Sequence, residues 1–278
     1  MARNRRVISQ TATYLLLSGF VLCLGLPFVW MLLTSFKPSA ELLEYPPSWR
    51  PETWRWRNYV EAWQAADFGW YFFNSAVTST ASAGLQVLFA AMMAYAFARI
   101  PFPGKSTLLG LVLATMLIPD EMKLIPNYLS MAWLGWINTY WALIVPPAAH
   151  AFPVFILYQH FRMLPKDMLE AAEIDGAGHV RLLFRILAPM SRPVLAACLL
   201  MSFIGRWNDF LWPLVVTETP DMRTLPIGLA FLKDVEAGAA QWHLLMAASV
   251  FVIIPVLILF VAVQKQFIGG ITQGALKG

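Results

Sequence analysis

Two ionisable residues lie inside an apolar stretch, Met201–Leu214, where their types and spacing could serve transport. Arg206 and Asp209 are three residues apart, so on a helix they share a face and can pair. A helix that starts near Val194 and rises 1.5 Å per residue puts Arg206 about 18 Å along it, just past the middle of a bilayer. Such a residue costs roughly 2.5–3.5 kcal/mol on insertion scales, and ionisable residues inside membranes usually mark a function.

Two interpretations of this stretch stay open. The charged pair can lock helices together, or Trp207, Asn208 and Asp209 can line a transport pathway. Aromatic and amide side chains suit sugars, because they stack on apolar ring faces and hydrogen-bond to hydroxyl groups. Asn127 and Tyr128 are further tentative pathway residues, since short apolar segments interrupted by proline often point to a transport route. A segment that simply ends early against a partner has the same pattern.

The remaining residues argue against covalent or metal chemistry. The four His are scattered, and Cys23 and Cys198 both fall in apolar stretches, so the sequence has no catalytic, disulfide or metal-ligand spacing. Gly104–Thr107 looks like the end of a phosphate-binding loop, but Arg99 stands where that motif needs Gly and no strand precedes it. We therefore expect a non-catalytic chain with no ATP site, cofactor or metal of its own.

The elements that must position these residues are membrane-spanning helices. Of 278 residues, 59% are hydrophobic and 13% charged, whereas soluble domains carry about 25% charged residues. We predict an all-α, polytopic membrane protein with six transmembrane helices in a single transmembrane domain, 1–278. A bilayer core needs about 20 helical residues. The expected spans are about 11–33, 73–98, 106–126, 140–161, 194–216 and 244–263, of which the third is short and interrupted after Pro119.

Two stretches within these spans predict particular packing. Asn74–Gly84 is rich in small residues, which let helices approach closely, so this part of the second span should pack against another helix. Pro146, Pro147 and Pro153 should kink the fourth span. His150 lies among these prolines and is interpreted as a packed polar residue.

Basic residues set the orientation. With the N-terminus inside, twelve Lys and Arg fall in inner segments and seven in outer ones, which favours N-in and C-in. The run Thr11–Leu33 is too long for a cleaved signal peptide and reads as the first span. Thr34–Trp70 and Thr217–His243 are then long outer loops. We interpret the five Trp of the first loop as an interfacial aromatic belt rather than a ligand platform.

The polar connection 164–193 then lies in the cytoplasm and divides into two short helices. Pro165 suits the first position of a helix. Negative charge follows in the early turns, where the helix dipole favours it; the residues are Asp167, Glu170 and Glu173.

Gly176 and Gly178 should break this helix, and a second should run over His179–Leu187 until Pro189 stops it. Two short amphipathic helices hinged at glycine form either a solvated connector or a docking knob for another protein.

The spacing in this connection resembles the EAA loop of ATP-binding-cassette importer permeases. Glu170-Ala171-Ala172 is followed by three residues and Gly176, then by nine residues and Ile186, and Pro189 closes the motif. In that family the loop is cytoplasmic and fits a groove on the ATPase subunit. The resemblance therefore implies an ATPase-coupling role for Glu170, Ala171, Ala172, Asp175, Gly176, Ile186 and Pro189.

The end of the chain, 264–278, resembles the tail of sugar permeases of the maltose-permease second-subunit type. The similarity extends to Asn208–Leu214 and Asn58-Tyr59. In those relatives the tail reaches into the ATPase interface, which implies ATPase contacts from Gln273, Gly274 and Lys277.

These resemblances imply the second, shorter permease of an ATP-driven, binding-protein-dependent importer of oligosaccharides or disaccharides, multi-pass in the bacterial cytoplasmic (inner) membrane. The implied partners are a second permease in a heterodimer, two ATPase subunits that bind ATP and Mg, an extracytoplasmic solute-binding protein and membrane lipid; we expect no nucleic acid. An importer of glycerol-3-phosphate or glycerophosphodiesters fits the same motifs. A stand-alone secondary transporter fits less well, because only Asp209 qualifies clearly as a coupling-ion carboxylate within a span and the Glu170 loop is left unexplained.

Overall fold

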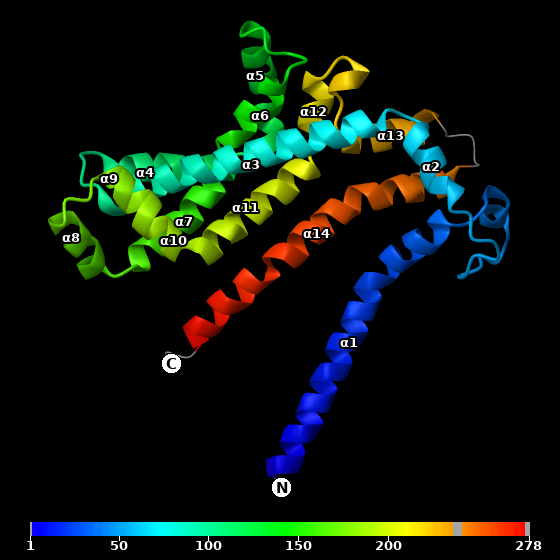
Figure 1. Ribbon diagram of the computed structural model, residues 1–278, viewed down its shortest axis with the longest axis horizontal. Helices are drawn as coiled ribbons and strands as arrows, with labels where there is room; N and C mark the ends of the chain where they lie inside the picture. The colour runs from blue at the N-terminus through cyan, green and yellow to red at the C-terminus, as the bar shows by residue number, and fades with distance from the viewer. Residues whose placement is uncertain (1, 236–240, 276–278) are drawn as a thin grey trace. The chain divides into compact units, whose positions relative to one another are not determined.

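The computed structural model describes residues 2–235 and 241–275, and within these ranges every regular element is a helix. This confirms the all-α prediction. The chain forms two compact units, one of Met1–Ala66 with Leu229–Ile253 and one of Asp67–Gly228 with Ile254–Gly278. Figure 1 shows the helices by label and by position along the chain.

Three helices in the described part of the chain are long and apolar enough to cross a membrane. They are α1 (Ala2–Ser35), α3 (Phe68–Arg99) and α14 (Trp242–Ala275). Two bent pairs also pass when each is taken together: α6 (Tyr140–Ala148) with α7 (Ala151–Met163), bent by 41°, and His179–Met190 with α11 (Arg192–Trp207), bent by 87°. The structure thus gives three such helices, or five if each bent pair is one span, where the sequence predicted six.

The predicted span at 106–126 accounts for the difference. It divides into α4 (Lys105–Ala114) with the 3-10 turn η2 (Thr115–Leu117), and then α5 (Asp120–Trp133). The break lies at Pro119, because a residue that precedes proline is pushed out of the helical region, and Ile118 is extended with φ −90° and ψ 114°. The sequence places the interruption at this same residue.

The second unit is built around α3. This helix packs against α6, α7 and α11 (Figure 1). Its buried face is small and polar over most of its first half, which confirms that Asn74–Gly84 packs against other helices. The buried residues there are Asn74, Ser75, Thr78, Ser79, Ser82 and Ala83.

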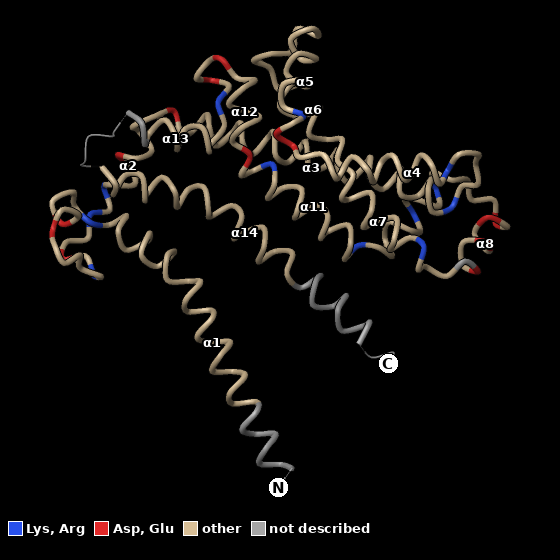
Figure 2. Tube along the Cα trace, turned by 180° about the vertical axis from the view of Figure 1, so that it is seen from behind, with Lys and Arg blue, Asp and Glu red and all other residues tan. Residues whose placement is uncertain are grey.

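Three short elements follow α11 in the chain. α12 (Leu211–Val216) resumes the line of apolar residues after a break at Asn208–Phe210, and η4 (Pro220–Met222) is a single 3-10 turn. α13 (Leu225–Val235) then begins with buried Leu225 and Ile227. Figure 2 shows that most charged residues lie at helix ends and connections, while the middle of the long helices is free of them.

The first unit holds α1, the compact loop that follows it and α2 (Arg57–Gln64). The loop is fixed by buried polar side chains. Lys37 is buried, donates to the backbone carbonyl and hydroxyl of Ser48, and lies 4.9 Å above the ring of Trp30. The buried Asn58 donates to the Ser35 and Lys37 carbonyls at 2.8 and 2.9 Å. This loop is therefore an ordered substructure, and its outer placement and the belt role of its Trp residues stay predictions.

Candidate functional site

The polar connection folds into the two short helices that its sequence predicts. The first, α8, runs over Lys166–Ile174, so Pro165 stands one residue before the helix rather than at its first position. Pro165 is extended, with φ −56° and ψ 130°. The buried Leu169 and the half-buried Ala172 and Ala177 attach α8 to the apolar core formed with α3 and α7.

Gly176 ends α8 in a left-handed conformation with φ +79°. The Gly176 N–H donates to the Glu173 carbonyl at 2.9 Å, and the Ala177 N–H donates to the Ala172 carbonyl at 3.0 Å. These two bonds form a Schellman motif, which satisfies the last carbonyls of a helix and favours glycine because other residues are strained there. Gly178, in contrast, has an ordinary φ of −71°.

The outward face of α8 is open to a partner. Glu170, Ala171, Asp175 and Gly176 are exposed, and the apolar side chain of Ile174 is 86% exposed. Figure 2 shows the acidic residues of α8 gathered at this end of the second unit. An exposed apolar side chain among carboxylates, on a helix whose opposite face packs on the core, is typical of a surface that docks on another protein.

The second short helix is less regular than predicted. α9 (His179–Arg181) leads into a π-helical segment, η3 (Leu182–Leu187), and then α10 (Ala188–Met190). The prediction that Pro189 stops the helix is wrong, because Pro189 lies within the last turn, and the 87° bend follows at Ser191. A wider turn accommodates the proline ring, which would collide with the carbonyl four residues earlier in a regular α-helix. Ile186 is half-buried against the core and Pro189 is exposed.

Two residues of α3, Tyr95 and Arg99, hydrogen-bond to this loop and to the end of α7. The Tyr95 hydroxyl and His179 Nδ1 are hydrogen-bonded at 2.8 Å. The Arg99 guanidinium donates to the Phe161 and Leu164 carbonyls at 2.6 and 2.9 Å. The Phe161 carbonyl lacks its helical partner because Pro165 has no N–H. Sequence reasoning placed Arg99 at the inner end of its span but missed both connections, and Tyr95 carries no sequence signal at all.

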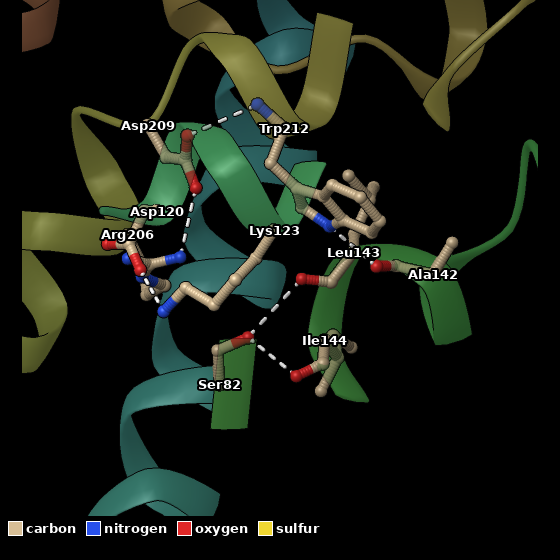
Figure 3. A network of polar contacts seen from close by, with 9 residues as sticks. All are labelled: Ser82, Asp120, Lys123, Ala142, Leu143, Ile144, Arg206, Asp209 and Trp212. Carbon is tan, nitrogen blue, oxygen red and sulfur yellow. Dashed lines mark hydrogen bonds and ion pairs between the residues drawn. The ribbon is translucent and has the colours of Figure 1, made fainter. Parts of the chain in front are cut away.

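Side chains from other helices likewise satisfy the kink between α6 and α7. Pro146 and Pro147 leave the carbonyls of Ala142 and Leu143 without helical partners. The indole Nε1–H of Trp212 donates to Ala142 at 2.8 Å, and the Ser82 hydroxyl reaches the carbonyls of Leu143 at 3.4 Å and Ile144 at 3.1 Å (Figure 3). This is how a bilayer tolerates proline within a span.

The bend itself falls at Ala149–His150. His150 is half-buried and accepts a bond from the Phe152 N–H at 3.4 Å, which makes it the cap of α7. Pro153 lies in the first turn of α7, where its missing N–H has no helical partner to lose, so it does not kink the span.

The predicted pairing of Arg206 with Asp209 is confirmed. The guanidinium lies 3.0 Å from the carboxylate, and the two side chains are 21% and 18% exposed. Asp209 also accepts from the Trp212 N–H, in the first turn of α12, at 3.4 Å. A second pair, Asp120–Lys123 at 2.5 Å, lies close enough for Asp120 to interact with Arg206 (Figure 3). Four charges therefore gather where α5 and α12 begin.

The tentative pathway residues have different environments. Trp207 is 1% exposed, stacked on Phe203 with ring centroids 5.5 Å apart and in contact with Phe72, so in this chain it packs in the core. Asn208 is exposed, although its amide donates to the Ile204 carbonyl at 2.9 Å.

The second pathway segment is α5, which bears exposed Asn127 and half-buried Tyr128. Asn127 and Asn208 are thus exposed, Asp209 is partly exposed and Trp207 is buried; the pathway role of these residues stays a prediction. The tail residues Gln273 and Gly274 fall at the end of α14, where side chains are not described, and Lys277 lies outside the described residues.

Comparisons with known proteins extend over nearly the whole chain. Residues 86–272 match the family model described as binding-protein-dependent transport system inner membrane component. A diacetylchitobiose uptake system permease protein of Streptomyces coelicolor is 36% identical over 253 residues, covering 90% of this chain and 83% of that protein. An arabinooligosaccharides transport system permease protein of Halalkalibacterium halodurans is 36% identical over 280 residues, covering 99% of this chain and all of that protein, 100%.

A solved structure shares the fold. It is a bacterial ABC transporter involved in the import of the acidic polysaccharide alginate, with a TM-score of 0.82 and 23% sequence identity, covering 95% of this chain and 98% of that one.

Proposed function

Since the chain belongs to the family of inner membrane components of binding-protein-dependent transport systems, we propose that it is a permease subunit of an ATP-driven importer of oligosaccharides or disaccharides. Family membership confirms the resemblance on which the prediction was based. The sugar class rests on relatives that carry diacetylchitobiose and arabinooligosaccharides by name. The observation that supports an external ATPase as the energy source is α8, which packs on the core through one face and leaves the other exposed for a docking partner.

The partners in this proposal are a second permease, two ATPase subunits and a solute-binding protein. The ATPases bind ATP and Mg, and the exposed face of α8, with Glu170 at its centre, docks on them. The tail from Gln273 onward reaches the same interface. ATP binding closes the ATPases, which moves the segment Pro165–Leu187 as a lever, and the spans then reorient from the inward-facing to the outward-facing state. The solute passes the polar helix break that carries Asn208 and Asp209.

The structure supports the lever through its connections. Arg99 holds the end of α7, from which the loop departs, and Tyr95 holds His179 at the start of the second short helix. A displacement of the loop therefore acts directly on α3 as well as along the chain. The second short helix is also attached to the core by its buried Leu182, Leu183 and Leu187. Because of this apolar packing, few polar contacts are needed for the helix to move together with the core.

The test is reconstitution of this chain with its second permease, ATPase and binding protein in lipid vesicles. ATP hydrolysis is measured against a panel of disaccharides, oligosaccharides and glycerol phosphates. We expect stimulation by sugars; stimulation by glycerol phosphates alone would refute the substrate class, and a complex without any ATPase would refute the proposal.

A matched pair of variants tests the knob. Glu170→Gln should weaken ATPase association or separate hydrolysis from uptake. Glu173→Gln on the same exposed helix, outside the motif, is the control. Equal effects of the two substitutions would remove the specific role of Glu170.

A further inference from the structure

The outer end of α3 carries a polar cluster for which the sequence predicts only close packing and to which the proposed function assigns no role. Asn74 is fully buried, at 0% exposure. Its amide nitrogen donates to the backbone carbonyls of Asp221 at 2.6 Å and Arg223 at 2.9 Å, and its oxygen accepts from the Tyr140 hydroxyl at 2.6 Å. Both N–H groups of the amide and its carbonyl are therefore engaged, each by an element distant in sequence.

The neighbouring residue extends the cluster. Ser75 Oγ accepts a hydrogen bond at 2.8 Å from the N–H of the buried Leu225, and Leu225 is the first residue of α13. Three residues before Asn74, α3 also lies close to α13, because a Cβ on Gly228 would collide with the ring of Tyr71. We call Asn74, Ser75, Tyr140 and the segment Asp221–Leu225 the outer clasp.

A second asparagine fixes the chain just ahead of the clasp. Asn138 has a left-handed φ of 59° and donates from its backbone N–H to the Val216 carbonyl at 2.8 Å. Its side-chain oxygen accepts from the Glu218 N–H at 2.9 Å and the Thr219 N–H at 3.2 Å. The first nine residues of the second outer loop, 217–225, are thus pinned at both ends and present the exposed Glu218–Asp221 as a preformed surface.

The two ends of α3 therefore hydrogen-bond to different segments of the chain. Asn74 and Ser75 hold the outer segment, and Tyr95 and Arg99 hold the cytoplasmic loop. From Asn74 to Tyr95 is about 30 Å at 1.5 Å per helical residue. We propose that Asn74 is a positioning residue for the solute-binding protein: it fixes the segment Asp221–Leu225 on the same rigid helix that the cytoplasmic loop moves.

This inference rests on the proposed function, since it assumes that the binding protein docks on the outer loops. A segment that is already held in place loses little conformational entropy when a partner binds to it. If the bonds of the outer clasp are removed, the segment must be ordered on binding, and this entropy cost weakens docking. Loss of the clasp should therefore raise the concentration of binding protein needed for half-maximal ATP hydrolysis, while the maximal rate is retained.

The experiment uses the reconstituted complex with sugar-loaded binding protein as the titrant. Asn74→Leu keeps the size of the side chain and removes all three bonds. We expect the half-saturating concentration to rise about tenfold. Thr78→Val is the matched control, because Thr78 is buried on the same face but donates only to the Asn74 carbonyl of its own helix, at 2.7 Å. The control should titrate as the wild type does.

Hydrogen exchange of the assembled complex without binding protein gives a second measurement. Amides of residues 221–225 should exchange faster in Asn74→Leu and at the wild-type rate in Thr78→Val. Wild-type titration and wild-type exchange in Asn74→Leu would overturn the proposal, and so would equal shifts in the two variants.

If Asn74→Leu fails to assemble, Tyr140→Phe and Ser75→Ala remove one clasp bond each and take its place, with rises of about threefold expected. If binding protein fails to stimulate the wild-type complex, the proposed function fails with the docking role, and exchange alone still tests whether Asn74 pins the segment.

Discussion

The glycine that ends α8 gives the sharpest test of the coupling loop. Gly176 has φ +79°, and a Cβ built there meets nothing within 4 Å. Replacement by Ala therefore creates no collision, and its whole effect is the conformational cost of a left-handed residue, about 1–2 kcal/mol. If the loop must keep this turn to dock, that cost weakens ATPase association by about five- to thirtyfold.

The assay is the affinity of the reconstituted permease pair for the ATPase, measured by titration in lipid nanodiscs. Three substitutions form a graded series, because asparagine tolerates the left-handed region better than alanine and a β-branched residue tolerates it worst. The expected order of affinity is Gly176→Asn, then Gly176→Ala, then Gly176→Val. Gly178→Ala is the control: its glycine is equally open but has an ordinary φ of −71°, so its affinity should stay at the wild-type value.

Two results would refute this reasoning. Equal affinities for Gly176→Ala and Gly178→Ala would show that the left-handed turn is not needed for docking. A Gly176→Val variant no worse than Gly176→Asn would show that side-chain bulk or flexibility, rather than backbone strain, decides the affinity.

Two further predictions concern the helix breaks. Replacing Asp209 alone by Leu should destabilise the permease in detergent by more than replacing both Asp209 and Arg206, because the single change leaves the largely buried Arg206 without the carboxylate that lies 3.0 Å away. A coupling energy below about 0.5 kcal/mol in the double-mutant cycle would contradict the pair. Trp212→Phe should lower stability by about 1–3 kcal/mol, since it leaves the Ala142 carbonyl without a donor, whereas equal stability of Trp212→Phe and wild type in the same unfolding assay would contradict that role.

The sequence predicts those features that depend on local chemistry. Gly176 as a helix end, the interruption at Pro119 and the Arg206–Asp209 pair each follow from residues a few positions apart, and the structure has all three. The stripe of small residues at Asn74–Gly84 predicts close packing, because small side chains have little other use in such a helix. It does not name the helices that pack there.

The sequence fails where a residue works through a distant partner. Trp207 belongs to a polar run that suits a sugar pathway, yet it is buried because aromatic rings on α3 and α11 enclose it. In the sequence Asn74 is one of several small polar residues, and its partner, the Asp221 carbonyl, lies 147 residues later in the chain. Tyr95 and His179 are 84 residues apart. Neither residue spacing nor hydrophobic periodicity predicts contacts between residues so far apart in the sequence.

One pattern joins these distant contacts. Prolines free the carbonyls of Ala142, Leu143 and Phe161, and each carbonyl is taken by a side chain from another helix: Trp212, Ser82 and Arg99. A backbone ladder resists bending because many bonds must break together, whereas a break held by one or two side-chain bonds needs few to be exchanged. Proline therefore places joints along the spans, and the donors on neighbouring helices hold each joint in one arrangement. A permease that reorients around a solute needs helices that bend at fixed places without exposing unsatisfied backbone to lipid. The two breaks, the kink between α6 and α7 and the end of α7, meet both conditions.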